Sequence, residues 1–203
     1  DAIVAECYTV DPRAYCQVEV SVWSDQVWIS GGIATREPVP RSLADIVHEV
    51  GRGIGYVPGN AIDAGLYRVT DVVCRFVCDP REWTNHVNDQ SISIGWAGYD
   101  EKTDYISPEH FLADRLRGSL FESCLGGELA GQGPDGKLLV RLRENPSAWH
   151  LEHVLLSLQH RPDLDVVELS ARAGRVIEAA YDALRAADAR WKSDWDEVEL
   201  CVN

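Results

Sequence analysis

The chain has 203 residues, 45% of them hydrophobic and 26% charged, which is enough apolar material for a sizeable core. Its formal net charge of −14 argues against nucleic-acid binding, because affinity for phosphates depends on clustered Lys and Arg. The sequence shows neither an apolar run of about 18 residues nor a signal-like start, so we expect neither a membrane protein nor a secreted one. We therefore expect it in the cytoplasm.

The first elements in chain order are a hairpin and a helix. Residues 17–35, QVEVSVWSDQVWISGGIAT, alternate apolar and polar residues on both sides of Ser24-Asp25, which is the pattern of two paired strands. Ser42 can cap a helix with an apolar face, and a series of glycines can end it. The apolar face comprises Leu43, Ile46, Val47 and Val50, and the glycines are Gly51, Gly53 and Gly55.

Two further strands are predicted before residue 98. Residues 66–78, LYRVTDVVCRFVC, are strand-like, and after a polar stretch the residues Ser91-Ile92-Ser93-Ile94 alternate again. In a half-buried strand, Ile92 and Ile94 would point into a core. Asp89 and Gln90 precede this strand. Because Asn-Asp pairs usually form turns, the stretch taken alone is compatible with a turn or with a ligand-binding pair.

The second half of the chain repeats this order of elements. Ser107-Pro108-Glu109 can begin a helix, and strands are expected at Leu138–Leu142, 149–158 and Val198–Val202, with a long amphipathic helix over 165–190. Hairpins mixed with helices predict an α+β protein with helices packed on one face of each sheet. We accordingly divide the chain into two α+β repeat domains, residues 1–98 and 99–203.

Several common site motifs are missing from the sequence. The six cysteines form no CxxC pair, so they are interpreted as small buried hydrophobic residues rather than zinc ligands. The six histidines form no HExxH motif, and neither a P-loop nor a GxGxxG motif occurs. These observations do not support a zinc hydrolase.

Four segments, taken in order, resemble the S-adenosylmethionine synthetase family. They are similar to the family's Ile-Gly-Tyr segment, its Gly-Asp-Gln strand, its Pro-Asp-x-Lys turn and its Ser-x-Gln-His strand, and together they span nearly the whole chain. In this sequence they read IGYVPGNAIDA at 54–64, NDQSISIGWA at 88–97, GPDGKLLV at 133–140 and VLLSLQH at 154–160.

The resemblance implies an α+β protein of pseudo-repeated domains with mixed or antiparallel sheets, three domains in the complete family fold. It also implies a transferase that moves the adenosyl group of ATP to the sulfur of methionine or a related amino acid. The triphosphate is then hydrolysed to phosphate and diphosphate, with Mg²⁺ and K⁺. The family's active sites lie between subunits, so the expected partner is a second copy or a second synthetase-like chain.

The resemblance also assigns roles to residues of this sequence. Asp89 and Gln90 would contact the methionine or adenosine end of the substrates, and Asp135 would lie beside the nucleoside. Ser157, in the fourth segment, would contact substrate or nucleotide. The resemblance therefore favours a ligand role over a turn role for Asp89.

For two charged residues, Lys137 and Glu19, both a site role and an ordinary surface role are considered. Lys137 would contact the triphosphate as a catalytic cation, and Glu19 would occupy the position of the K⁺ ligand. Sulfur attack on a ribose carbon requires alignment and cationic stabilisation of the leaving triphosphate, which suits a lysine. The alternatives are a solvated turn charge for Lys137 and an exposed strand carboxylate for Glu19.

The sequence also departs from the family. Its Gly-His-Pro-Asp-Lys element would precede Asp1, and its Gly-Gly-Pro-x-Gly-Asp segment would follow Asn203; because the sequence begins at Asp1 and holds no methionine, we expect residues upstream. Where the family's hairpin carries a glutamate after two glycines, Gly32 stands in a Gly-Gly-Ile, so that carboxylate is missing. Three interpretations stay open: an enzyme subunit completed by another segment or chain, a catalytically inactive regulatory or structural paralogue that binds a synthetase partner or a nucleotide, and an unrelated α+β scaffold.

Overall fold

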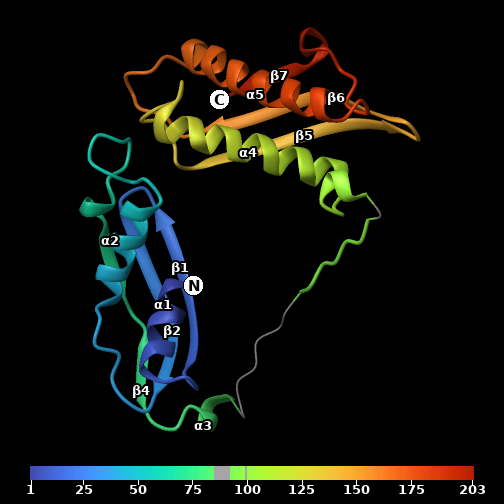
Figure 1. Cartoon of the computed structure of the whole chain (residues 1–203). Helices are drawn as coiled ribbons and strands as arrows, with labels where there is room; N and C mark the ends of the chain where they lie inside the picture. Colours follow the sequence, from blue (N-terminus) through green and yellow to red (C-terminus); the bar gives the residue numbers. More distant parts are fainter. Residues whose placement is uncertain (85–91, 99) are drawn as a thin grey trace. The chain divides into compact units, whose positions relative to one another are not determined.

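The computed structural model describes residues 1–84, 92–98 and 100–203. The chain forms two compact units, Asp1–Ser93 and Ile94–Asn203 (Figure 1). No helix in the described part of the chain is long and apolar enough to cross a membrane.

The first unit is built on a four-stranded mixed sheet. Strands β1 (Tyr15–Trp23) and β2 (Gln26–Thr35) form the predicted antiparallel hairpin. Strands β3 (Arg68–Asp71) and β4 (Cys74–Val77) both pair in parallel with β2, one after the other. The helices of this unit are α1 (Ala2–Val10), α2 (Leu43–Gly53), the 3-10 turn η1 (Ala64–Leu66) and the single turn α3 (Arg81–Thr84).

The core of the first unit lies between β2 and the helices α1 and α2. The Ser42 hydroxyl accepts a hydrogen bond from the backbone N–H of Ala44 at 3.2 Å and so caps α2 as predicted. Buried apolar side chains from β2 meet buried side chains from both helices. These are Val27, Ile29 and Ile33 from β2, Ile3 and Cys7 from α1, and Leu43 and Ile46 from α2.

The second unit has the same order of elements around a three-stranded mixed sheet. Strands β5 (Gly136–Asn145) and β6 (Ala148–Leu158) form an antiparallel hairpin, and β7 (Glu199–Val202) pairs in parallel with β6. Figure 1 shows both long helices of this unit on one face of its sheet. The helices are α4 (Pro108–Gly126), α5 (Val166–Ala187) and the 3-10 turns η2 (Glu101–Thr103) and η3 (Trp195–Glu197).

The core of the second unit is formed by α4, β6 and α5. Ser107 caps α4 by accepting from the N–H of His110 at 3.4 Å, and Asp165 caps α5 by accepting from the N–H of Val167 at 2.6 Å. The most deeply buried side chains are apolar or aromatic and come from all three elements. They include Leu112, Leu116, Leu151, Val154, Leu156, Leu169, Ile177 and Tyr181.

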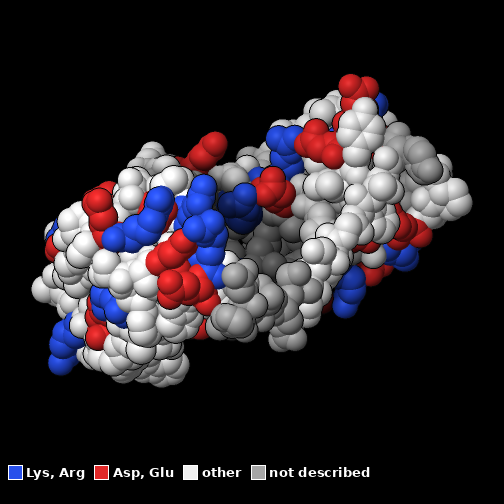
Figure 2. Space-filling view, turned by 90° about the horizontal axis from the view of Figure 1, so that it is seen from below, with Lys and Arg blue, Asp and Glu red and all other residues white. Residues whose placement is uncertain are grey.

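The prediction of an α+β fold is therefore confirmed, with mixed sheets in both units. In each unit a helix, a hairpin and a second helix are followed by strand pairing parallel to the second strand of the hairpin, from β3 and β4 in the first unit and from β7 in the second. Acidic and basic side chains lie next to one another on the face shown in Figure 2. Much of the basic charge there is consequently balanced locally.

Three local predictions are wrong. Residues 92–98 form no strand, and Ile92 and Ile94 are 88% and 94% exposed instead of buried. The run 66–78 is interrupted at Val73, whose N–H donates to the Asp71 carboxylate at 3.0 Å. Gly51 does not end α2 but lies buried within it.

The cysteines fit their prediction only in part. Cys7 is buried, and burial raises the pKa of its thiol to about 12, but Cys74 and Cys201 are exposed. All six are free thiols. Both lie on short edge strands: all four residues of β4 are exposed, and in β7 the alternation of side chains turns Cys201 away from the core.

Candidate functional site

Three of the predicted site residues come together at one end of the sheet in the second unit. Asp135 lies in the turn before β5, and Lys137 is the second residue of β5 and pairs with Ser157 of β6. The turn is held by backbone bonds from Gly133 N to Gln159 O at 2.7 Å and from Gln159 N to Asp135 O at 2.9 Å. Segments 133–140 and 154–160, two of the four that resemble the synthetase family, are thus hydrogen-bonded neighbours.

Asp135 and Lys137 both line a cavity of about 450 Å³ between α4 and the start of β5. Helix α4 adds Asp114 and Arg117, which form an ion pair at 2.7 Å. In the described part of the chain, no hydrogen bond or ion pair engages the Lys137 ammonium, so its charge is available to a ligand. The remaining lining is mostly apolar, with His110, Leu120, Phe121, Cys124, Leu138, Leu156 and Leu158 among its residues.

This cavity therefore combines apolar walls with a carboxylate and a lysine. Burial raises the pKa of the Cys124 thiol, which keeps that side chain neutral within the apolar wall. A ligand with a flat apolar part and an anionic group would suit such a lining. The Ser157 hydroxyl is already engaged, because it donates to Oδ1 of Asn203.

Glu19 lies in the first unit, in the middle of β1 and opposite Ser30 of β2. It lines a second cavity, of about 290 Å³, on the sheet of that unit. The lining comprises Glu19 together with Tyr15, Gln17, Gly31, Gly32, Cys74, Phe76 and Trp83. We call this the Glu19 cavity.

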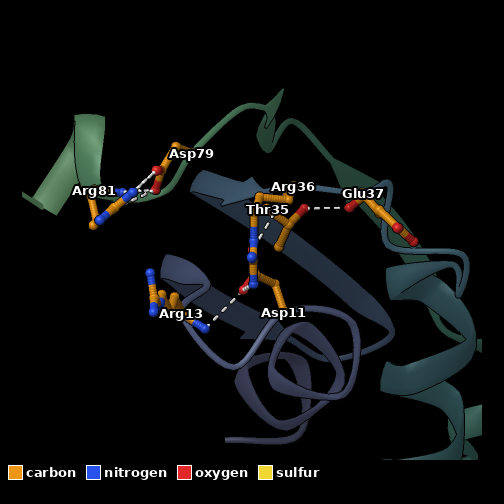
Figure 3. A network of polar contacts seen from close by, with 7 residues as sticks. All are labelled: Asp11, Arg13, Thr35, Arg36, Glu37, Asp79 and Arg81. Carbon is orange, nitrogen blue, oxygen red and sulfur yellow. Dashed lines mark hydrogen bonds and ion pairs between the residues drawn. The ribbon is translucent and has the colours of Figure 1, made fainter.

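A polar network lies at the end of β2 (Figure 3). The carboxylate of Asp11 is buried and accepts hydrogen bonds from the Arg36 guanidinium, which lowers its pKa well below the usual range. Nearby, hydrogen bonds from Arg81 lower the pKa of Asp79 to about 2. Asp11 and Arg36 join the loop before β1 to the end of β2, whereas Asp79 and Arg81 form a separate ion pair at the start of α3.

Sequence reasoning missed the aromatic side chains of the Glu19 cavity. Tyr15, Phe76 and Trp83 come from β1, β4 and α3, and no local spacing connects them. Asp89 and Gln90 lie outside the described residues. The Gly-Gly-Ile of the hairpin brings no carboxylate: Gly32 lines the Glu19 cavity, and Ile33 is 2% exposed and belongs to the core.

Comparison with known proteins indicates a distant relationship to S-adenosylmethionine synthases. No protein-family model matches the chain. The chain is 24% identical to the S-adenosylmethionine synthases of two strains of Staphylococcus epidermidis, in matches that cover 83% of this chain and 47% of each relative. The chain thus spans about half the length of the curated relatives it matches.

Proposed function

We propose that this chain is one part of an S-adenosylmethionine synthase-type transferase. It would transfer the adenosyl group of ATP to the sulfur of methionine or a related amino acid, with release of phosphate and diphosphate. A second copy or a second synthetase-like chain, or a further segment, would supply the remaining site residues. The observation that carries the proposal is that Asp135 and Lys137, from the Pro-Asp-Gly-Lys turn, line one cavity.

The available charge of Lys137 suits this chemistry. When sulfur attacks the ribose carbon, negative charge develops on the leaving triphosphate, and a positioned ammonium stabilises it. Apolar side chains, among them Leu138 and Leu158, line the cavity beside Lys137 and would contact an apolar part of the nucleotide. Asp135 lies on the same turn and lines the same cavity, where its carboxylate would accept from a ribose hydroxyl.

Mg²⁺ and K⁺ belong to the proposal through the resemblance. Among residues 1–84, 92–98 and 100–203, no group of three His, Cys, Asp or Glu is arranged to hold a metal ion. Glu19 brings a single carboxylate to its cavity, whereas hard cations take several oxygen ligands. Either ion would therefore need oxygen ligands from outside the described residues.

A second function is favoured by one observation. Gly32, which lines the Glu19 cavity, stands where the resemblance implies a carboxylate near the substrate amine. A chain that lacks this group could still bind a nucleotide or a synthetase partner without turnover. This alternative is a catalytically inactive regulatory or structural paralogue.

Nucleotide titration of the protein with its partner tests both functions. We expect Lys137→Ala to weaken binding of a non-hydrolysable ATP analogue by roughly one to two orders of magnitude, the loss of a charge-assisted contact. Lys192→Ala, at an exposed lysine of the same unit outside the cavity, is the matched control and should bind as the wild type does. Nucleotide binding with formation of S-adenosylmethionine supports the transferase, and binding without it supports the paralogue. Equal affinity of Lys137→Ala and the wild type would contradict a nucleotide role for this cavity.

A further inference from the structure

One side of the Glu19 cavity is an aromatic wall. The Trp83 ring stacks on Tyr15 with ring centroids 5.7 Å apart and an interplanar angle of 29°. It also packs on Phe76 with centroids 4.4 Å apart. Because the three rings come from α3, β1 and β4, the wall exists only in the folded unit.

The carboxylate of Glu19 lines the same cavity. Alternation along β1 places Tyr15, Gln17 and Glu19 on one face of the sheet. Within the part of the chain that the structure describes, no hydrogen bond or ion pair occupies the Glu19 carboxylate. Its charge is therefore available to a cation in the cavity.

Two glycines leave room beside the wall. A Cβ atom on Gly32 would lie 3.8 Å from Cε1 of Tyr15, so a longer side chain there would extend over the space next to that ring. At Gly31, φ is +129° and a Cβ atom would lie 2.1 Å from the carbonyl oxygen of Gln17, which excludes any other residue. This part of the cavity is consequently lined by backbone.

Two local hydrogen bonds support the aromatic wall, one of them from Asp79, which Figure 3 shows beside Arg81. Asp79 accepts from the backbone N–H of Arg81 at 3.1 Å and so holds the first turn of α3, which carries Trp83. The Tyr15 hydroxyl donates to Oε1 of Gln17 at 2.7 Å, which orients its ring. The cavity is thus organised before a ligand arrives.

We infer that the Glu19 cavity binds an organic onium cation, a methylated ammonium or a sulfonium group. Aromatic rings attract cations through their negative faces, and an adjacent carboxylate adds to the attraction. A methyl-bearing cation is weakly hydrated and can contact rings, whereas K⁺ requires several oxygen ligands. The volume, about 290 Å³, is close to the lower end of ligand pockets, which suits a small group. This inference does not rest on the proposed adenosyl transfer.

Titration of the full chain with tetramethylammonium chloride tests the inference. We expect saturable binding that Trp83→Leu and Glu19→Gln each weaken by about tenfold. Trp23→Leu is the matched control, because Trp23 is 77% exposed and lies outside the cavity. The neutral isostere tert-butanol and K⁺ should each bind at least about tenfold more weakly than tetramethylammonium. The inference would be overturned if tert-butanol or K⁺ bound as tightly as tetramethylammonium, or if Trp83→Leu bound tetramethylammonium as tightly as the wild type does.

Two pairs of ligands distinguish whether the cavity binds a methylated ammonium or a sulfonium group. Choline against 3,3-dimethylbutan-1-ol, and S-adenosylmethionine against S-adenosylhomocysteine, each compare a charged group with a neutral one of similar shape. A preference for the charged member that Trp83→Leu abolishes assigns the ammonium or the sulfonium, respectively; no preference in either pair overturns the inference. Lys137→Ala should leave tetramethylammonium binding unchanged, so failure of the nucleotide proposal remains distinguishable from failure of this one.

Discussion

Arg36 holds the buried carboxylate of Asp11 with two charge-assisted hydrogen bonds, from Nε to Oδ2 at 2.8 Å and from Nη2 to Oδ1 at 2.6 Å. The same carboxylate accepts from the backbone N–H groups of Arg13 at 3.0 Å and Arg36 at 3.1 Å. Removal of the charge would leave these donors poorly matched in a buried position. This pair therefore makes the stability of the first unit depend on pH.

The dependence has a definite sign. The Arg36 guanidinium lowers the pKa of folded Asp11, so the carboxylate stabilises the fold above the unfolded pKa of about 4 and loses this effect as pH falls through the folded pKa. We expect Asp11→Asn to lower the melting temperature by several degrees at pH 7 and by less at pH 2.5. Thermal unfolding followed by circular dichroism measures this, with Glu82→Gln, an exposed carboxylate of the same unit, as control. An equal decrease at both pH values would contradict it.

Two glycines of helix α2 give a matched pair of substitutions. A Cβ atom on Gly51 would lie 2.5 Å from Cβ of Ala64 and 3.2 Å from Cε2 of Tyr67, so Gly51→Ala should destabilise the fold by about 1–3 kcal/mol. A Cβ atom on Gly53 meets nothing within 4 Å, so Gly53→Ala should be neutral or stabilising by up to about 1 kcal/mol. Urea unfolding measures both. Similar free energies of unfolding for the two variants would show that α2 moves away from Ala64 at little cost.

Helix α4 offers a buried and an exposed leucine. Leu112 is fully buried in the core of the second unit, so Leu112→Ala should lower the free energy of unfolding by about 2–5 kcal/mol. Leu125 is 68% exposed on the same helix, so Leu125→Ala should change the free energy of unfolding by less than about 0.5 kcal/mol. A large effect at Leu125 in dilute solution would instead indicate that this side chain is covered by another chain.

The role of Asp89 stays a prediction from the sequence. If it is a ligand residue, Asp89→Asn should weaken binding of ATP, methionine or S-adenosylmethionine by about tenfold or more in calorimetry and leave the melting temperature nearly unchanged. If Asp89 only forms a turn, Asn serves equally well and binding is retained. Wild-type affinity in Asp89→Asn would remove the local support for a ligand role.

Elements with strong local signals were predictable from the sequence. The hairpin β1–β2 follows from alternation around Ser24-Asp25, and α4 follows from its cap at Ser107 and its apolar spacing. Helix α1 was missed because its residues, AIVAECYTV, are mostly apolar and show no clear division into an apolar and a polar face. The alternation at 91–94 predicted a strand, but a strand also needs a neighbour to pair with, which periodicity alone does not supply.

The candidate sites were predictable to different degrees. The cavity beside Asp135 and Lys137 joins residues of one turn, and a single short motif pointed to both. The Glu19 cavity was not predictable, because Tyr15, Phe76 and Trp83 are brought together only by the parallel pairing of β4 with β2 and by the position of α3. Contacts between segments far apart in sequence leave no local spacing to find.

The interruption at Val73 affects how the first unit can aggregate. A long continuous edge strand offers unpaired backbone groups to other chains. On the side of β2 that carries β3 and β4, the edge is divided into two strands of four residues each, and Arg75 donates to the Asp71 carboxylate across the break. An incoming strand would find at most four residues in register before it met a kink and an ion pair. The break in β3–β4 thus protects this edge against fibril-like growth.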